Sequence, residues 1–392
     1  MKWTHRRIAI LLVLASSLAV AETPTQSITV NCNNGQSLNT TLTKLNRQAS
    51  YIVSVSGTCT EYVKVTGFDN LELKGLAGAT LVQPSSAAGN LFNSLLYIES
   101  SRSVIVDGFT LQADTVTDPA IGIGHGSSDI RLRHLNIAGG TFGIAVFENS
   151  QVSIAYVSAQ NPGYAALGVY DSSDVHVEHT VFENSTGASY HAGMDVGASH
   201  ITVYDTTISN MQVGISAHNG SIIDVLTFNT YYAIGGPTDV VIDNSAGTND
   251  NGVTIDTGGS LNVTGAKLVI NKPGQSYGGT TGGILISDGA SLNAASGYLV
   301  ITGSNGHGII VLNNSHATVS GATVTRGSHG GLVAANLSSI EVGSGNVLTL
   351  VGGNSVDLFC DPGSTITGSA NLSGAPTAQC TNLLAGETVT LP

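Results

Sequence analysis

Titratable side chains gather in the middle of this 392-residue chain. Asp195, His191 and His218 are of the types that act as general acids and bases, because a carboxyl or imidazole group exchanges a proton within hydrogen-bond reach of a reacting atom. Phenol groups in the same segment would bind a ligand by hydrogen bonding or ring stacking. They belong to Tyr164, Tyr170 and Tyr190. The alternative is that all of these are solvated or turn-stabilising side chains of a polar face.

A second group of candidates has the composition of a charged or metal-binding cluster. Its members are Arg131, Arg133, His176, Glu178 and His179. In the stretch "VHVEH" the spacing of His176 and His179 resembles that of metal ligands, but residues i and i+3 point to opposite sides of a straight strand. A bend would bring the two rings together. Otherwise these are turn side chains that form hydrogen bonds between neighbouring strands.

An internal repeat must position these residues. The stretches "GIAVFENSQVSIAYVSAQN" and "GVYDSSDVHVEHTVFENS" each open with Gly and a branched apolar residue, place a Ser two positions before another apolar residue, and then alternate. The Gly starts recur at intervals of about 21 residues or more, which indicates a constant core with variable loops. They are Gly122, Gly143, Gly168, Gly193, Gly214, Gly252, Gly283, Gly308 and Gly331.

Each repeat is built of short strands. Segments such as "SQVSI", "SDVHV" and "SHITV" place apolar residues at alternate positions, so that one face of the strand is buried. One unit is too short to bury that face alone, so the units must stack about 4.8 Å apart through backbone hydrogen bonds. We therefore predict an all-β solenoid of about eleven coils, with a short amphipathic helix at 36–46 covering the first coil.

The run from about 122 to 342, with its "GI" starts and "S-x-V-x-V" strands, resembles the right-handed parallel β-helix superfamily that includes pectate lyases. The resemblance implies that the "GI" strand is the first of each coil, and that a site acting on polysaccharide lies on its face and bordering loops. No specific enzyme family is matched. The expected function is to bind or process extracellular carbohydrate, by glycoside hydrolase-like or lyase-like chemistry. The alternative is a non-catalytic surface or adhesive solenoid.

The repeat predicts which candidate side chains share the outer face of the first strand. The residue two positions after each Gly points outward, so Asp195 has Tyr170 and Ser216 on its two neighbouring coils. His218 lies diagonally across at roughly 8 Å. The loop just before the same strand holds Tyr190 and His191. If the site is hydrolytic, Asp195 is the predicted proton-transfer residue.

Charge restricts the partners and the chemistry. The net charge is −13, and no Lys or Arg lies between 134 and 266. This argues against nucleic acid, because phosphate binding needs clustered cations. It also argues against a polyuronate and against pectate-lyase-like elimination, which uses Arg or Lys. Calcium is a possible cofactor, and its oxygen ligands would come from an acidic segment that is otherwise a hydrated loop. These residues are Asp239, Asp243, Asp250 and Asp256.

The ends of the chain indicate export. Residues 1–21 have the basic start, short apolar run and small residues of a secretory signal peptide, and no later segment is apolar enough to span a bilayer. A secreted or periplasmic protein is therefore expected, in which Cys32 with Cys59 and Cys360 with Cys380 form disulfides rather than free buried thiols. The predicted units are the signal peptide (1–21), cap and first coil (22–60), β-helix (61–355), and C-terminal coil and tail (356–392).

An apolar stripe is expected on the later coils. Leu285, Ile310 and Val333 should point outward from the first strand, and an exposed apolar patch usually marks a contact. Either the C-terminal segment "NLLAGETVTLP" covers this stripe, or parallel solenoids self-associate through it.

Overall fold

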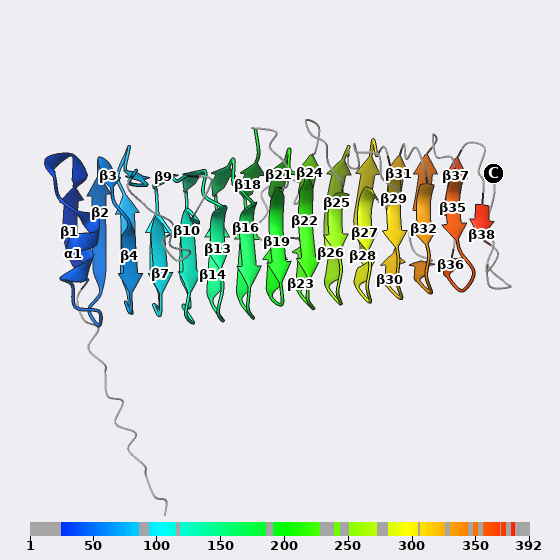
Figure 1. Ribbon diagram of the computed structural model, residues 1–392, viewed down its shortest axis with the longest axis horizontal. Helices are drawn as coiled ribbons and strands as arrows, with labels where there is room; N and C mark the ends of the chain where they lie inside the picture. Colours follow the sequence, from blue (N-terminus) through cyan, green and yellow to red (C-terminus); the bar gives the residue numbers. More distant parts are fainter. Residues whose placement is uncertain are drawn as a thin grey trace, which may run out of the picture.

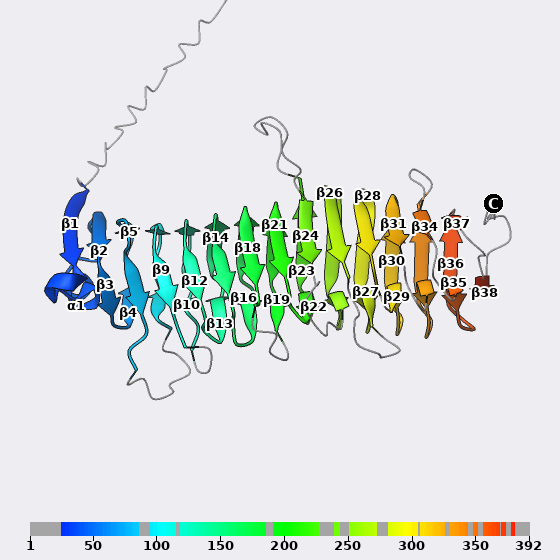
Figure 2. The same ribbon diagram turned by 90° about the horizontal axis from the view of Figure 1, so that it is seen from above.

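The computed structural model shows a long solenoid with a helix at its N-terminal end (Figure 1), and a perpendicular view shows the coils side by side along one axis (Figure 2). The described residues are 25–85, 94–114, 118–185, 191–227, 239–243, 251–272, 281–304, 306–325, 330–343, 348–351, 356–368, 370–373 and 378–380. The expected signal peptide and the C-terminal segment from 382 onward lie outside them.

One face of the solenoid is a 13-stranded sheet that contains the Gly-apolar starts, and its strands are paired in parallel. In order along the axis they are β4 (Val63–Thr66), β7 (Leu96–Glu99), β10 (Ile121–Gly124), β13 (Phe142–Val146), β16 (Ala165–Tyr170), β19 (Ala192–Gly197), β22 (Val213–His218), β25 (Asn251–Ile255), β27 (Gly282–Ile286), β29 (His307–Val311), β32 (Gly330–Ala334), β35 (Val356–Cys360) and β38 (Ala378–Cys380). The solenoid is therefore somewhat longer than about eleven coils.

The second and third strands of the coils form one 25-stranded sheet. The second strands are β1 (Gln26–Asn31), β2 (Tyr51–Ser56), β5 (Leu71–Gly75), β8 (Val104–Asp107), β11 (Ile130–Arg133), β14 (Gln151–Ala155), β17 (Asp174–Glu178), β20 (His200–Val203), β23 (Ile222–Leu226), β30 (His316–Val319), β33 (Ser339–Val342) and β36 (Thr365–Gly368). The third strands are β3 (Thr58–Thr60), β6 (Thr80–Val82), β9 (Thr110–Gln112), β12 (Asn136–Ala138), β15 (Ser158–Gln160), β18 (Thr180–Glu183), β21 (Thr206–Ser209), β24 (Asp239–Asp243), β31 (Ala322–Thr325), β34 (Leu348–Val351) and β37 (Ala370–Ser373). In β26 (Ser260–Asn271) and β28 (Ser291–Thr302) the two strands run on without a break.

Stacking buries the apolar face, as the repeat predicts. Val152 pairs with Val175, and Val175 pairs with Ile201, so the three side chains lie above one another in successive coils. All three are buried and belong to one core that extends along the solenoid. The inward column that the alternation predicts is therefore confirmed for the second strands of these coils.

The Gly and Ser of the repeat have separate structural roles. A Cβ on Gly193 would lie 2.3 Å from Ile208 Cγ2, so the first inward position has no room for a side chain. The Ser residues form a buried ladder, in which the backbone N–H of Ser150 donates to Ser173 Oγ and that of Ser173 donates to Ser199 Oγ, each at 3.2 Å. The Gly leaves space for the neighbouring coil, and the Ser hydroxyls accept from backbone N–H groups that would otherwise be buried without partners.

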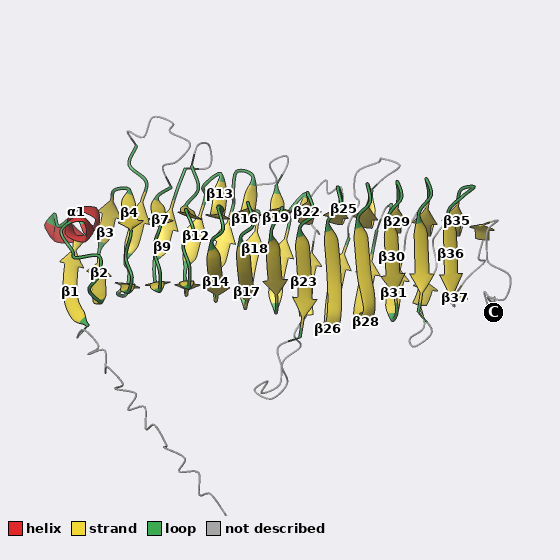
Figure 3. Ribbon diagram, turned by 90° about the horizontal axis from the view of Figure 1, so that it is seen from below, coloured by secondary structure: helices red, strands yellow, loops and turns green. Residues whose placement is uncertain are grey.

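The N-terminal end is closed by helix α1 (Leu38–Thr43), which follows a short 3-10 helix, η1 (Cys32–Asn34) (Figure 3). Ser37 Oγ caps α1 by accepting from the backbone N–H of Thr40 at 3.0 Å. Glu61 accepts from the backbone N–H of Leu38 at 2.7 Å and ties the helix start to the next coil. Leu38 and Leu42 are fully buried, which confirms the predicted amphipathic cap.

Disulfides are present near both ends. The Cys32–Cys59 bond is confirmed, with a Cα–Cα distance of 5.1 Å. Cys360 is also disulfide-bonded, and its Cα partner on the next coil is Cys380, whose side chain lies outside the described part. Among the described residues, no helix has the length and apolar character needed to cross a bilayer.

Candidate functional site

Four neighbouring strands of the 13-stranded sheet carry the candidate residues: β16, β19, β22 and β25. Parallel pairing places one outward residue of each strand in a common row. This row contains Gly168, Asp195, Ser216 and Thr254. A second row, two residues further along the strands, contains Tyr170, Gly197 and His218. The candidate carboxylate, phenol and imidazole therefore share one surface.

The register differs from the expected one at Tyr170. The Cα partner of Asp195 is Gly168, and Tyr170 lies two positions further along its strand. The cause is Ala166, which is fully buried at the level where the next coil has Gly193. Ala is small enough for this inward position, so Ala166 takes the place of the Gly that starts the strand in other coils. The alignment on Gly168 is therefore two residues too far along this strand.

Side-chain hydrogen bonds nevertheless bring the predicted residues together. Tyr170 Oη donates to Asp195 Oδ2 at 2.6 Å. His218 Nε2 lies 3.1 Å from Asp195 Oδ1, and Asn219 Nδ2 lies 2.9 Å from His218 Nδ1. The amide of Asn219 donates to Nδ1, which assigns the proton of a neutral imidazole to Nε2 and makes that nitrogen a donor to Asp195. Both oxygens of Asp195 thus accept hydrogen bonds, which fixes the orientation of the carboxyl group.

Tyr170 is fixed as a donor. Burial, followed by the negative charge of Asp195, raises the pKa of Tyr170 well above its ordinary value. The phenol therefore stays protonated over the whole range in which proteins are studied, and it orients Asp195 without competing for its proton.

Asp195 forms part of the wall of a polar pocket. The pocket has a volume of about 430 Å³ including its mouth, which is open to solvent. The part that water-sized groups can occupy is only about 100 Å³, below the range usual for drug-sized ligands, so the pocket would take part of a ligand rather than enclose it. The lining residues are Tyr164, His191, Ala192, Asp195, Gln212, Val213, Ser216, Thr254 and Asp256.

His191 lines this pocket in an unusual state. The residue is only 6% exposed, and neither ring nitrogen makes a hydrogen bond within the described part of the chain. Burial lowers the pKa of His191, and a contact with the backbone of Pro162 that falls short of hydrogen-bond geometry opposes this only in part, so the ring is neutral near pH 7. A buried polar group without a partner costs free energy. Such a group on a pocket wall is available to a ligand.

The predicted tyrosines have different outcomes. Tyr164 lies on the pocket wall with 37% of its surface exposed, and its ring packs edge-on against Phe142 at 5.3 Å. Tyr170 lies beside the pocket and acts on it through Asp195. Tyr190 lies outside the described residues.

Two pocket residues were not assigned to this site from the sequence. Ala217 pairs with Ile255, so Asp256 follows β25 in the outward row of His218, as the alternation predicts, but it was considered only as a calcium ligand. Gln212 comes just before β22 and carries no pattern that separates it from a loop residue. Only the folded geometry places the two on one wall with Asp195.

The second cluster is divided in the structure. Arg131 pairs with Asp129 at 2.8 Å. His176 lies on β17 with its ring 4.8 Å from that of Tyr204 and with Glu178 nearby at 3.5 Å. His179 lies in the following turn, where φ is +48°, and it stacks on Tyr156 at 4.8 Å and contacts Asp205. The two rings thus have different partners, and among the described residues they are not part of a metal-ligand group. Arg133 ends β11 on the same sheet.

Metal-ligand geometry is confined to one place in the described ranges. It comprises Cys32, Cys59 and Glu61, where the two sulfurs already form a disulfide. Of the residues considered for calcium, Asp239 pairs with Lys267 at 3.5 Å on the 25-stranded sheet, whereas Asp256 lies in the pocket on the other sheet. Asp250 lies outside the described residues. Calcium binding stays a prediction.

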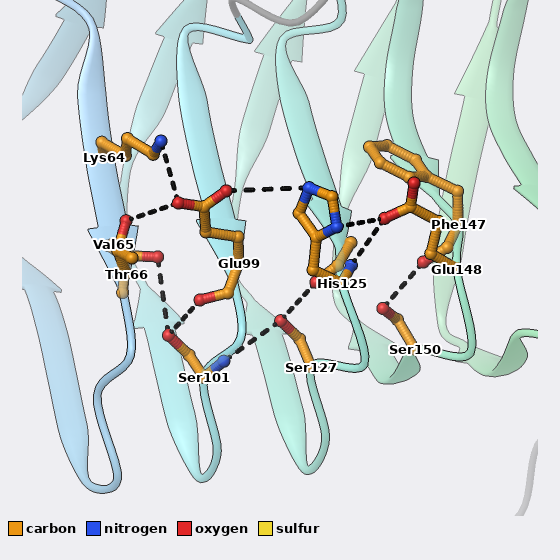
Figure 4. A network of polar contacts seen from close by, with 11 residues as sticks. Lys64, Val65, Thr66, Glu99, Ser101, His125, Ser127, Phe147, Glu148 and Ser150 are labelled. Atoms are coloured by element: carbon orange, nitrogen blue, oxygen red, sulfur yellow. Dashed lines mark hydrogen bonds and ion pairs between the residues drawn. The ribbon is translucent and has the colours of Figure 1, made fainter.

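A further polar network lies on the same sheet, nearer the N-terminus (Figure 4). Glu99 accepts from Lys64 at 2.8 Å, and His125 Nδ1 contacts Glu148 at 2.6 Å while its Nε2 faces Glu99 at 3.8 Å. Burial raises the pKa of Glu99, but hydrogen bonds from Lys64 and Thr66 outweigh it and leave that pKa below its ordinary value. The charged groups of this network are paired with one another, so we interpret the network as one that stabilises neighbouring coils.

The residues of the apolar stripe are aligned as predicted, but two of the three side chains are buried from solvent. Leu285, Ile310 and Val333 are successive Cα partners. Leu285 is partly exposed, but Ile310 is 1% and Val333 8% exposed, so the expectation of an exposed stripe is wrong at these two positions. Self-association through the stripe stays a prediction.

A family model agrees with this fold, and the chain was also compared with solved structures and curated proteins. A family model described as a right handed beta helix region matches residues 86–230. Among solved structures, the catalytic domain of a GH87 alpha-1,3-glucanase in complex with nigerose is 15% identical, with 88% of this chain and 68% of that chain covered at a TM-score of 0.42. An aspartate-to-alanine variant in complex with tetrasaccharides is 16% identical, with the same coverage and a TM-score of 0.40. No curated protein matches the sequence. The chain is a right-handed parallel β-helix.

Proposed function

We propose that this protein binds carbohydrate in the pocket beside Asp195, and that Asp195 acts on the bound sugar as a general base. The observation that carries the proposal is the buried, unpartnered His191 on the same wall as a carboxylate held by two donors. A sugar presents many hydroxyl groups, and the pocket presents an imidazole, an amide, two carboxylates and three hydroxyls. Tyr164 adds a half-exposed ring that offers stacking.

The chemistry assigned to Asp195 follows from its bonds. Tyr170 and His218 orient the carboxyl group by donating to one oxygen each, and the remaining lone pairs of these oxygens can accept a proton from water or from a sugar hydroxyl. Elimination from a uronate is disfavoured, because none of the pocket residues is a Lys or Arg that would neutralise the sugar carboxylate. Hydrolysis of a glycosidic bond fits the pocket better.

Two variants test this proposal on the mature protein with a panel of oligosaccharides. His191→Ala should weaken binding at least about tenfold, as expected when one buried hydrogen bond to the ligand is lost. Asp195→Asn should abolish any turnover. The matched control is Asp171→Asn, which removes a charge from an exposed turn outside the pocket. Binding without turnover in the wild type would assign a non-catalytic role to the site. Equal binding by wild type and His191→Ala would contradict the proposal.

We also infer export to an oxidising compartment. The Cys32–Cys59 disulfide supports this, because disulfides persist outside reducing cytosol. Alkylation of the protein isolated from its native compartment, with and without prior reduction, tests the inference. Labelling of Cys32 and Cys59 without reduction would contradict it.

A further inference from the structure

The pocket presents negative charge to its ligand. Asp195 and Asp256 both line it, and none of its lining side chains is Lys or Arg. Burial lowers the pKa of His191, so this ring contributes no positive charge near neutral pH. A ligand in this pocket therefore meets two carboxylates and otherwise neutral groups.

The surroundings have the same sign. No Lys or Arg lies between 134 and 266, a segment that includes β16, β19, β22 and β25. The next cation along the chain, Lys267, pairs with Asp239 on the other sheet. An acidic surface raises the local concentration of cations and repels anions.

The two carboxylates differ in how well they are satisfied. Asp195 is 5% exposed and accepts from Tyr170 and His218. Asp256 is half-buried and accepts from Thr257 Oγ1 at 2.9 Å, which uses one of its two oxygens. Asp256 therefore has the greater capacity for a charged donor on a ligand.

We propose, on the basis of the carbohydrate site above, that the sugar bound in this pocket carries a free amino group and that its ammonium faces Asp256. The ligand class is a polymer or oligomer of de-N-acetylated hexosamine units. His191, with its unpartnered nitrogens, then binds a hydroxyl of the same unit.

Charge selects between sugar classes at such a site. An ammonium compensates a carboxylate that loses water when the ligand enters, and it forms a charge-assisted hydrogen bond. A neutral hydroxyl compensates the carboxylate less well, because a partly desolvated charge needs an opposite charge nearby. A uronate is repelled by both aspartates.

The test compares one oligohexosamine in two forms, with free amines and after chemical N-acetylation, by calorimetric titration of the mature protein. Neutral and uronic oligosaccharides of the same length complete the panel. We expect the free-amine form to bind at least about tenfold more tightly than the acetylated form. This preference should fall with added salt, disappear in Asp256→Asn, and persist in Asp171→Asn, which changes the net charge equally.

The outcomes separate this inference from the site on which it rests. If acetylated or neutral oligosaccharides bind as tightly as the free-amine form, and His191→Ala weakens their binding, the pocket is a carbohydrate site but the amino-sugar assignment is wrong. If the free-amine form binds equally to wild type and Asp256→Asn, the assignment is also wrong. If no member of the panel binds, both proposals fail.

Discussion

Tyr170 Oη donates to Asp195 Oδ2 at 2.6 Å, although the two residues are not Cα partners in the sheet. Gly168 and Gly197 make this possible, because Gly168 is the Cα partner of Asp195 and Gly197 that of Tyr170, and neither has a side chain. A Cβ on Gly168 would lie 2.8 Å from the Tyr170 ring. The phenol crosses from one outward row to the other and fixes the carboxylate.

Replacing Tyr170 should therefore cost more than an ordinary Tyr→Phe change. We expect Tyr170→Phe to lower the free energy of unfolding by about 1–3 kcal/mol, since it removes a donor from a buried carboxylate. The control is Tyr298→Phe, whose hydroxyl bonds Thr323 Oγ1 at 3.0 Å on an exposed surface, and which should cost less than about 0.5 kcal/mol. Urea unfolding measures both. Equal losses would show that the Tyr170 bond has no special role.

The buried His191 should lower the stability of the free protein while it is needed for carbohydrate binding. His191→Leu is expected to raise the free energy of unfolding by about 1 kcal/mol, because it replaces a buried polar group that lacks a partner. It should also abolish binding of the carbohydrate. Binding sites often retain such unfavourable residues.

The stability difference at His191 should depend on pH. Burial lowers the pKa of His191 in the folded protein, so below the unfolded value of about 6.5 the unfolded chain takes up a proton that the folded chain does not. The wild type should lose stability relative to His191→Leu as the pH falls from 8 to 5. Thermal melts at several pH values measure this, and a constant difference would contradict the burial of a neutral ring.

His200 should show the opposite pH dependence. Its Nδ1 lies 2.8 Å from Asp174 and its Nε2 2.9 Å from Asp224. Burial lowers the pKa of His200, but the bonds to Asp224 and Asp174 outweigh it and raise that pKa above its ordinary value. Its contribution to stability is therefore fully present below the unfolded pKa and is lost as the pH rises through the folded pKa.

The variant His200→Gln tests this contribution. It should lower the melting temperature more at pH 6 than at pH 9, by a modest amount because the side chain is 40% exposed. A penalty that is the same at both pH values would mean that the ring is not charged between the two aspartates.

The inward glycines predict an intolerant position. A Cβ on Gly193 would lie 2.3 Å from Ile208 Cγ2 and 2.5 Å from the carbonyl oxygen of Gly214. Gly193→Ala should destabilise the protein by about 1–3 kcal/mol through overpacking. Ala166 occupies the matching level one coil earlier, where a methyl group is accommodated. There Ala166→Gly should cost about 1 kcal/mol or less. If both variants melt like the wild type, the inward column is packed less tightly than described.

The fold was predictable because it is set by local repetition. Val152, Val175 and Ile201 occupy the same place in three copies of one pattern, so alternation alone assigns them to a common inward column. The helix that covers the first coil was also visible in the spacing of Leu38 and Leu42. Neither inference needed the length of a loop or the direction of a side chain.

The site was predictable only in part, because it depends on register and on side-chain reach. The repeat placed Asp195 and His218 on one face, but at a backbone separation that hid their contact at 3.1 Å. Tyr170 was two positions out of place, since Ala166 substitutes for Gly at the start of its strand. The repeat also placed Asp256 in the outward row of His218, but it did not show that this carboxylate lines the same pocket as Asp195.

The most direct test of the account is a crystal structure of the protein with a bound oligosaccharide from the panel. We predict a sugar unit in the pocket with one hydroxyl within hydrogen-bond distance of a His191 ring nitrogen and another polar atom within reach of Asp195. A sugar bound on the 25-stranded sheet, or on the 13-stranded sheet with no contact to His191 or Asp195, would contradict the central claim that this pocket is the functional site.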